Sequence, residues 1–237
     1  MRAKIWYLHH SGFAVQTSDH FLIFDYWKQS PKGKGLDSGV INPAALSGKD
    51  VIVFVSHSHS DHFNRNILSW GAYIPKLRYV LSNDIRAMPG SIMIGPGQTR
   101  TQQDFTVAAL KSNDAGVAFI IEIDGLCIYH AGDLNWWHWV GDTDEENAEL
   151  ACIYKEQISL LGGRRIDLAF VPVDPRLGEQ YAWGINYFMQ HVDARCAVPM
   201  HFGNDSAVVE RLLRDEASEP YRDKTLRLTE RGATAEI

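Results

Sequence analysis

Residues 51–62, VIVFVSHSHSDH, join an apolar run to a cluster of potential metal ligands. The run at 51–56 is rich in β-branched side chains and predicts a strand that is buried on both faces. Four ligand-type side chains follow it within six positions: His57, His59, Asp61 and His62. Imidazole and carboxylate groups bind borderline divalent metals, and the end of a buried strand holds them rigidly. The stretch therefore predicts a metal site at a strand end.

Three further apolar runs also end in such side chains. The run at 126–129 leads through His130-Ala-Gly to Asp133, and the run at 194–199 leads to His201. Asp25 directly follows Phe-Leu-Ile-Phe at 21–24, the position in which α/β folds place site residues. A plain turn aspartate is the alternative for Asp25. We therefore expect several strand ends to meet at one rim.

These motifs resemble those of the metallo-β-lactamase-fold hydrolase superfamily. The matches are H-x-H-x-D-H at 57–62, IYHAGD ending at Asp133 and VPMH ending at His201, so the resemblance covers nearly the whole chain. It implies an α+β fold, an αββα four-layer sandwich of two facing mixed β-sheets with helices on the outer faces. Because no repeat or low-complexity linker interrupts the sequence, we expect a single domain over 1–237.

The resemblance also implies a ligand set and a reaction. It assigns one metal to His57, His59 and a bridging Asp133, and a second metal to Asp61, His62, Asp133 and His201. The implied enzyme is a hydrolase in which a metal-bound hydroxide attacks a small ester, lactone or phosphoester, with Asp61 and Asp133 at the catalytic centre. The ligands suit one or two divalent ions, with zinc preferred and manganese or iron possible. Asp25 would hold a metal-bound histidine by its other ring nitrogen.

One departure from the family pattern concerns the first metal. Relatives commonly carry a histidine in a G-H-T-x-G stretch, but residues 111–116 read Lys-Ser-Asn-Asp-Ala-Gly, and no histidine lies between His62 and His130. Asn113 or Asp114 would substitute as an oxygen ligand, or the enzyme would work with one ion. The departure favours a resemblance to the ascorbate-6-phosphate lactonase-like branch over the antibiotic-hydrolysing branch.

Other residues are candidates for the substrate pocket. His10 lies in a His-Ser-Gly turn that resembles one beside the metal in relatives. The expected substrate-side wall comprises Asp174, Arg176, Tyr181 and Trp183, with a structured surface loop as the alternative. Arg176 would pair with an anionic group. The segment Trp136–Trp139 is interpreted as an aromatic wall of the pocket, or alternatively as a cover of the core.

Composition narrows the class of protein. The net charge of −6 provides no basic field for nucleic acid or an anionic membrane, so we expect a small-molecule substrate; the oligomeric state is left open. No apolar run is long enough to span a bilayer. Cys127, Cys152 and Cys196 form no C-x-x-C pair and predict reduced, mostly buried thiols in a cytoplasmic protein. The alternatives are a nuclease or phosphodiesterase of the same superfamily and a non-catalytic metal-binding or sensing protein.

Local patterns predict the remaining elements. Residues 61–70 predict a helix, and 82–103 predict irregular chain because of their Pro and Gly content. The capping box Thr143-Asp-Glu-Glu146 predicts a helix that runs to about residue 161. Residues 28–49 predict a long loop that includes Lys32, and residues 225–228 and 233–237 predict a terminal hairpin.

Overall fold

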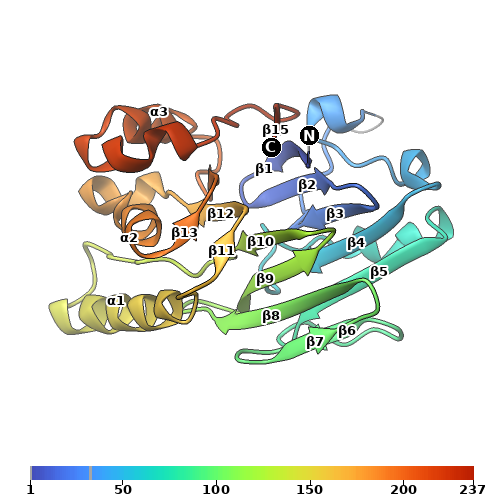
Figure 1. Ribbon diagram of the computed structural model, residues 1–237, viewed down its shortest axis with the longest axis horizontal. Coiled ribbons are helices and arrows are strands. Elements are labelled where there is room, and N and C mark those ends of the chain that lie inside the picture. Colours follow the sequence, from blue (N-terminus) through green and yellow to red (C-terminus); the bar gives the residue numbers. More distant parts are fainter. Residues whose placement is uncertain (1, 32–33) are drawn as a thin grey trace.

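Two mixed β-sheets face each other in the computed structural model, which describes residues 2–31 and 34–237 (Figure 1). Within these residues the first sheet has the order β15-β1-β2-β3-β4-β5-β6, and the second has the order β14-β12-β10-β9-β8-β7. The first sheet contains β1 (Lys4–His9), β2 (Gly12–Gln16), β3 (His20–Phe24), β4 (Asp50–Val55), β5 (Lys76–Ser82), β6 (Ile92–Ile94) and β15 (Thr234–Glu236). The second contains β7 (Thr99–Thr101), β8 (Phe105–Lys111), β9 (Val117–Ile123), β10 (Leu126–His130), β12 (Leu168–Pro172) and β14 (Ala197–Met200).

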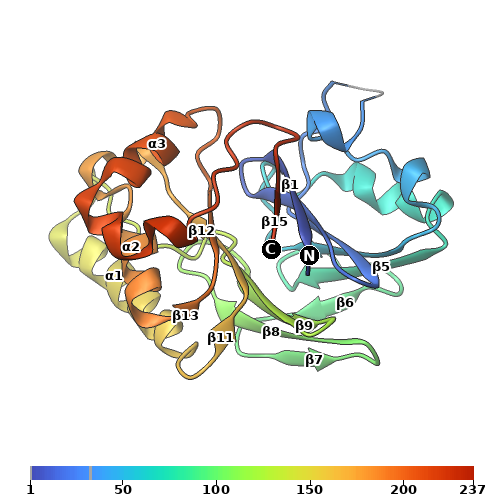
Figure 2. The same cartoon turned by 45° about the horizontal axis from the view of Figure 1, so that its top comes forward.

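Helices cover the outer face of each sheet. Figure 2 shows α1 (Asp144–Ser159), α2 (Trp183–His191) and α3 (Ala207–Arg214) gathered beside the second sheet. The outer face of the first sheet packs against 3-10 helices, chiefly η2 (Pro43–Leu46) and η3 (Arg65–Ala72). The other short elements are η1 (Leu36–Ser38), η4 (Pro175–Gln180), η5 (Glu216–Lys224) and the parallel pair β11 (Arg165–Ile166) and β13 (Asp193–Ala194). The predicted αββα layering is confirmed, although one outer layer consists of 3-10 turns.

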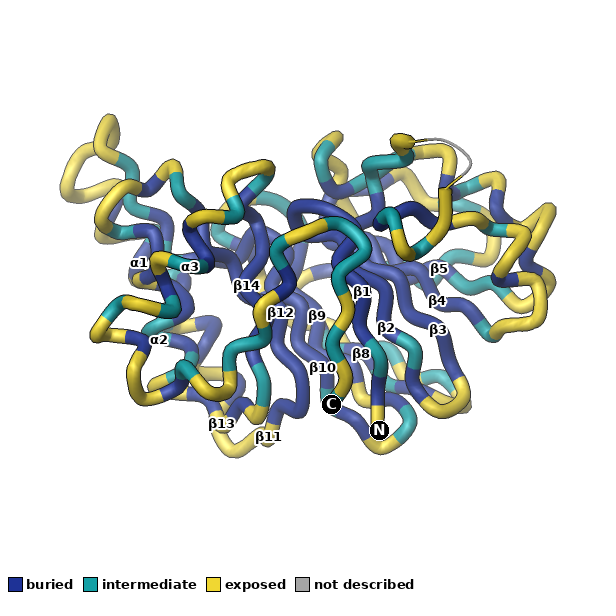
Figure 3. The backbone as a smooth tube through the Cα atoms, turned by 90° about the horizontal axis from the view of Figure 1, so that it is seen from above, coloured by how far each residue is buried: buried dark blue, intermediate teal, exposed yellow. Residues whose placement is uncertain are grey.

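Strand periodicity divides the apolar residues between two clusters. In β1, Ile5 and Tyr7 face the space between the sheets, whereas Trp6 and Leu8 face the 3-10 helices. The central strand β4 is buried on both faces, as predicted. Figure 3 shows buried strands through the middle of the molecule and exposed residues mainly in loops and on outer turns. Because the two faces of β4 pack into different clusters, the register of β4 is fixed, and with it the position of His57 after the strand.

Several local predictions are wrong. The predicted helix at 61–70 is the 3-10 helix η3, which begins only at Arg65. Residues 82–103 contain the short strands β6 and β7, each of which finds a partner strand that sequence periodicity does not reveal. The C-terminal strand β15 pairs with β1 instead of forming a hairpin with residues 225–228. Among the thiols, Cys152 is exposed and the other two are half-buried, so the expectation of mostly buried cysteines is also wrong.

Other predictions are confirmed. Helix α1 begins with the predicted capping box, in which Thr143 Oγ1 accepts the N–H of Glu146 and the Glu146 carboxylate accepts the N–H of Thr143. The loop at 28–49 is largely irregular but contains η1 and η2, and Lys32 lies outside the described residues. No helix in the described part of the chain is long and apolar enough to cross a membrane.

The topology directs five strand ends to one rim. In the first sheet β3 and β4 are parallel, and in the second β10, β12 and β14 are parallel. The carboxyl ends of parallel strands lie at the same edge of a sheet. Within three residues of these ends the chain places Asp25, His57, Asp133, Asp174 and His201.

Candidate metal centre

Asp133 lies at the centre of the site, between histidines from both sheets. Its Oδ2 lies 3.4 Å from Nε2 of His57, and its Oδ1 lies 3.2 Å from Nε2 of His62 and 3.2 Å from Nε2 of His201. His57 and His62 follow β4 in the first sheet, whereas Asp133 and His201 follow β10 and β14 in the second. One carboxylate oxygen therefore faces each side of the centre, as a bridging ligand requires.

The potential ligand atoms form two groups, each within 4.8 Å. One group is His57, His59 and Asp133, the set that the family resemblance assigns to one metal. The other is His10, His62 and His201; Asp61, which the resemblance assigns to the second metal, is not in this group. The side chain of Asp61 is half exposed, lines the same cavity as Asp133 and His201, and lies with Oδ2 3.5 Å from Nε2 of His10.

Hydrogen bonds behind the rings orient three of the histidines. Nδ1 of His62 donates to Asp25 Oδ2 at 2.8 Å, and Nδ1 of His201 donates to Asp174 Oδ2 at 3.0 Å. Ser56 Oγ donates its own proton to Asp25 at 2.6 Å, so it accepts from Nδ1 of His57 at 2.9 Å. With Nδ1 donating in each ring, Nε2 is the nitrogen that faces Asp133 and that would offer its lone pair to a bound cation, the arrangement found in metal-ligating histidines.

The atoms that face the centre fit a bound cation. Within the described chain, Nε2 of His57, Nε2 of His62 and Oδ1 of Asp133 are buried and have no hydrogen-bond partner. Leaving a buried polar group unpaired costs about 1–3 kcal/mol. Imidazole nitrogens and a carboxylate are donors that zinc, manganese and iron accept. A divalent ion would therefore satisfy atoms that the protein leaves without partners.

The charges at the centre also favour a cation. Burial acts to raise the pKa of Asp133, but His201 and His62 hold it well below its usual range. Burial acts to lower the pKa of His201, yet Asp133 and Asp174 raise it to about 10. The pKa of Asp174 itself falls to about 2, against the effect of burial, because His201 and Arg176 hydrogen-bond to its charged form. Buried carboxylates thus remain ionised and attract positive charge.

Backbone strain accompanies this arrangement. His10, Asp25 and His201 have φ values of 59°, 41° and 67°, in the left-handed region that side chains rarely adopt. Such a conformation costs about 1–3 kcal/mol and persists where surrounding bonds enforce it. For Asp25 those bonds run from the N–H and Oγ of Ser56 and from His62.

Gly116 allows the chain before β9 to pack closely against the end of β4. Gly116 has φ +65°, and a Cβ at this position would overlap the backbone oxygen of Ser56. The same oxygen accepts the N–H of Val117 at 3.0 Å, so the chain around Gly116 lies directly against the residue that precedes His57. Sequence analysis missed both Gly116 and Ser56. The available signal was a small polar residue that ends a buried strand.

The centre opens into a cavity of about 430 Å³. The candidate ligands Asp133, His59 and His201 line it, and Trp137 and Trp139 form an aromatic part of its wall. The Trp136–Trp139 segment therefore contributes two of its three tryptophans, Trp137 and Trp139, to the cavity wall. Trp136 faces away, into a small groove with Trp183 and Tyr187.

Several candidates for the pocket have other positions. Arg176 lines the cavity, but Asp174 lies behind His201 and Arg176 instead of forming a wall. Tyr181 is buried and donates its hydroxyl to Asp215 at 2.8 Å, and Trp183 packs on Trp136 with ring centroids 5.2 Å apart. Neither is among the described residues that line the cavity, which corrects the prediction for both.

Of the two proposed substitute ligands, Asn113 has its amide occupied by backbone groups, whereas Asp114 lines the cavity and stays a candidate. Nδ2 of Asn113 donates to the carbonyls of Asn135 and Leu150 at 2.8 and 2.9 Å, and its Oδ1 accepts the N–H of Asn135 at 3.3 Å. Asn113 thus uses its amide to attach the Trp136–Trp139 segment to α1. Asp114 lies exposed on the cavity wall. His130 is buried, and its Nε2 donates to the carbonyl of Ser11 at 2.9 Å.

The fold and this donor set define an αββα protein with a candidate histidine–aspartate metal centre. A family model described as "Beta-lactamase superfamily domain" matches residues 4–201, and the chain belongs to this family. Among its relatives, the UPF0173 metal-dependent hydrolase of Opitutus terrae is 25% identical over 256 residues, which cover 99% of this chain and 100% of the relative. A UPF0173 metal-dependent hydrolase of Thermococcus kodakarensis is 26% identical over 238 residues, 90% of this chain and 93% of the relative.

Solved structures show the same fold. Igni18, a metallo hydrolase from Ignicoccus hospitalis, matches with a TM-score of 0.64 and 18% identity, covering 99% of both chains. The metallo-beta-lactamase fold protein YhfI from Bacillus subtilis matches with a TM-score of 0.61 and 15% identity, also covering 99% of both chains. The narrower resemblance to the ascorbate-6-phosphate lactonase-like branch stays a prediction.

Proposed function

We propose that this protein is a metal-dependent hydrolase of a small ester, lactone or phosphoester that carries an anionic group. Membership of the superfamily and the likeness to relatives named metal-dependent hydrolases support the class of enzyme. The observation that carries the proposal is the set of Nε2 atoms directed at Asp133 on the floor of an open cavity. A solvent-accessible site on a metal centre is typical of catalysis, because substrate needs an open position.

Some of these residues would bind the metal ions, and others orient the metal-binding side chains. His57, His59 and Asp133 would hold one ion, and His62, His201, Asp133 and Asp61 a second, with zinc preferred over manganese or iron. When bound, such an ion polarises the substrate and lowers the pKa of a water molecule, to about 7 at catalytic zinc sites. Asp25 and Asp174 keep His62 and His201 in the tautomer that presents Nε2.

Arg176 is the group that we assign to the anionic part of the substrate. Its Nε donates to Asp174 at 3.0 Å, and its guanidinium lies 5.4 Å from the ring centroid of Trp139. These contacts fix the guanidinium at the cavity before substrate arrives, which reduces the entropy lost on binding. A guanidinium recognises carboxylate and phosphate oxygens through directed N–H groups.

The remaining charges of the cavity favour a small substrate. Asp61, Asp114 and Asp142 also line it, and Arg176 is the one Lys or Arg side chain among the described lining residues. Such a wall repels a polyanion, so we do not propose nuclease activity. One anionic group can reach Arg176 without bringing further phosphates near the carboxylates.

The test compares neutral and anionic substrates. Zinc- and manganese-loaded protein is assayed on neutral p-nitrophenyl acetate and on two anionic substrates, p-nitrophenyl hemisuccinate and bis-p-nitrophenyl phosphate. An Asp133→Ala variant is assayed in parallel. Turnover that disappears in Asp133→Ala supports the hydrolase. Arg176→Met should raise KM by about tenfold or more for the two anionic substrates, the hemisuccinate ester and the phosphodiester, but not for the acetate, with unchanged metal content. The matched control is Arg195→Met, an exposed arginine outside the cavity. Equal rates in wild type and Asp133→Ala would disprove the proposal.

A further inference from the structure

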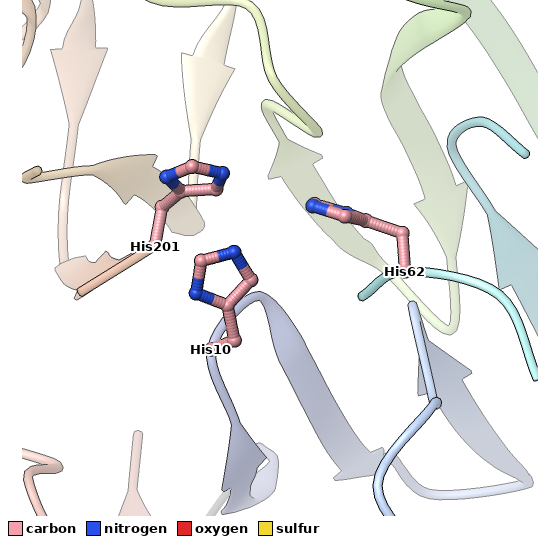
Figure 4. A group of neighbouring side chains, drawn as sticks. All are labelled: His10, His62 and His201. Carbon is pink, nitrogen blue, oxygen red and sulfur yellow. The ribbon is translucent and has the colours of Figure 1, made fainter. Parts of the chain in front are cut away.

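His10 lies beside the metal centre, in the turn between β1 and β2. Its N–H donates to Tyr7 Oη at 2.8 Å, and its carbonyl accepts the N–H of His201 at 3.2 Å. The ring faces those of His201 and His62, with centroids 4.0 and 5.4 Å away (Figure 4). Distance alone would admit His10 as a metal ligand together with these two histidines.

The hydrogen bond at Nδ1 of His10 argues against metal binding by this ring. The backbone N–H of Gly203 donates to Nδ1 of His10 at 3.1 Å. A backbone N–H can only donate, so Nδ1 of His10 holds a lone pair. A neutral imidazole then carries its proton on Nε2. His57, His62 and His201 have the opposite tautomer, because their Nδ1 atoms donate to Ser56, Asp25 and Asp174.

The front of the ring therefore presents an N–H group. Nε2 of His10 is buried and has no hydrogen-bond partner within the described chain. His10 is not among the described residues that line the cavity, but its ring packs on His201 and its Nε2 lies next to Asp61, and both of these do line it. The carboxylate of Asp61 comes to 3.5 Å, which is long for a hydrogen bond. A buried donor without an acceptor is costly, and an acceptor from outside the chain would satisfy it.

We infer that His10 is not a metal ligand and instead donates its Nε2–H to a substrate oxygen held at the metal centre. The inference rests on the proposed hydrolase function. His10 forms and breaks no covalent bond; it stabilises the oxygen that gains negative charge while the scissile bond is attacked. The contacts at its N–H, carbonyl and Nδ1 fix the donor in place before reaction, and such preorganised donors contribute about 10²–10³-fold to kcat.

The first test reads the tautomers directly. In full-length, zinc-loaded protein with ¹⁵N-labelled histidine, long-range ¹⁵N–¹H correlation spectra distinguish protonated, bare and metal-bound ring nitrogens. We expect a proton on Nε2 of His10 and on Nδ1 of His57, His62 and His201. The His10→Gln variant identifies the His10 signals by their loss. A protonated Nδ1 with a metal-bound Nε2 at His10 would overturn the inference.

The second test separates ligation from catalysis. His10→Ala and His10→Gln should bind zinc within about twofold of wild type in chelator competition, whereas His62→Ala should lose at least about 100-fold. The kcat of His10→Ala should fall about 10²–10³-fold with KM nearly unchanged, and His10→Gln should recover part because its amide also donates.

Two results would contradict the inference. One is a loss of zinc affinity of about tenfold or more in His10→Ala, as for a ligand, and the other is an unchanged kcat. Failure of the proposed function would look different, because wild type itself would then hydrolyse none of the test esters. The tautomer spectra and zinc affinities would still determine whether His10 is a ligand.

Discussion

Oδ2 of Asp174 lies 3.0 Å from Nδ1 of His201, although the two residues follow different strands, β12 and β14. The same carboxylate also accepts from Nε of Arg176, so one buried aspartate orients a candidate ligand and the candidate substrate-binding group. Asp174→Asn would weaken both contacts while preserving the shape of the side chain.

We expect Asp174→Asn to lower zinc affinity by about 10–100-fold, because the carboxylate holds the His201 ring in its tautomer and orientation. Zinc affinity is measured by competition with a chromogenic chelator. The matched control is Asp205→Asn, an exposed aspartate four residues after His201. Equal affinities in the two variants would show that Asp174 does not orient His201.

Asn113→Ala tests the function of the residue at the position of the missing family histidine. Because the Asn113 amide is occupied by Asn135 and Leu150, the variant should keep the metal stoichiometry of wild type. It should instead loosen the Trp136–Trp139 segment, measured as faster acrylamide quenching of tryptophan fluorescence. Loss of one ion per chain by elemental analysis would show that Asn113 is a ligand after all.

Gly116→Ala should strongly destabilise the fold. Its φ of +65° alone costs an alanine about 1–2 kcal/mol, and the overlap with the backbone oxygen of Ser56 adds a steric cost that a flexible side chain cannot relieve. Gly163→Ala is a matched control, since Gly163 also has a positive φ, +78°, but open space around its Cβ position. In urea unfolding, Gly116→Ala should lose at least about 2 kcal/mol more than Gly163→Ala. Equal losses would contradict the close packing.

His20 links the two sheets at the edge that lies away from the metal centre. Its Nε2 lies 2.8 Å from Asp104, and its Nδ1 lies 2.9 Å from Asp124, so both nitrogens donate and the ring is charged. Arg78 also holds Asp104 and pairs with Asp50, and Thr17 donates to Asp124. Burial acts to lower the pKa of His20, but Asp124 and Asp104 raise it overall.

A raised folded-state pKa gives stability that is fully present below the unfolded value of about 6.5. This contribution is lost as pH rises through the folded-state pKa. His20→Gln should therefore cost about 2 kcal/mol near pH 6 and progressively less in alkaline solution, measured by urea unfolding at a series of pH values. His191→Gln, an exposed histidine on α2, is the control. A cost that does not change with pH would rule out the charged pair.

Metal removal should lower thermal stability, because the ligands come from both sheets and the unfolded chain does not hold them together. A ligand at 1,000 times its Kd stabilises the folded state by about 4 kcal/mol. Chelation should thus lower the Tm of wild type and leave that of Asp133→Ala unchanged. Equal shifts in both proteins would place the stabilising ion elsewhere.

Sequence reasoning succeeded where a local pattern alone determines structure. The β-branched run before His57 specifies a buried strand, and Thr143 with Glu146 specifies the start of α1. The candidate ligands were predicted because each follows such a run within a few residues. These signals depend only on neighbours along the chain.

Sequence reasoning failed where partners are distant. Asp174 was assigned to the substrate wall because nothing local indicates that it lies behind His201. The edge strand β15 was paired with its neighbour in sequence, although its partner β1 begins about 230 residues earlier. Tyr181 was assigned to the substrate-side wall, but its hydroxyl donates to Asp215 and it is not among the described residues that line the cavity.

The division of the centre between the two sheets also has a consequence for biosynthesis. His57, His59 and His62 leave the ribosome long before Asp133, and His201 follows later still. A nascent chain therefore exposes three histidines without the carboxylate that joins them to the other half. The complete candidate coordination set can therefore form only after His201 has been synthesised and the two sheets have met.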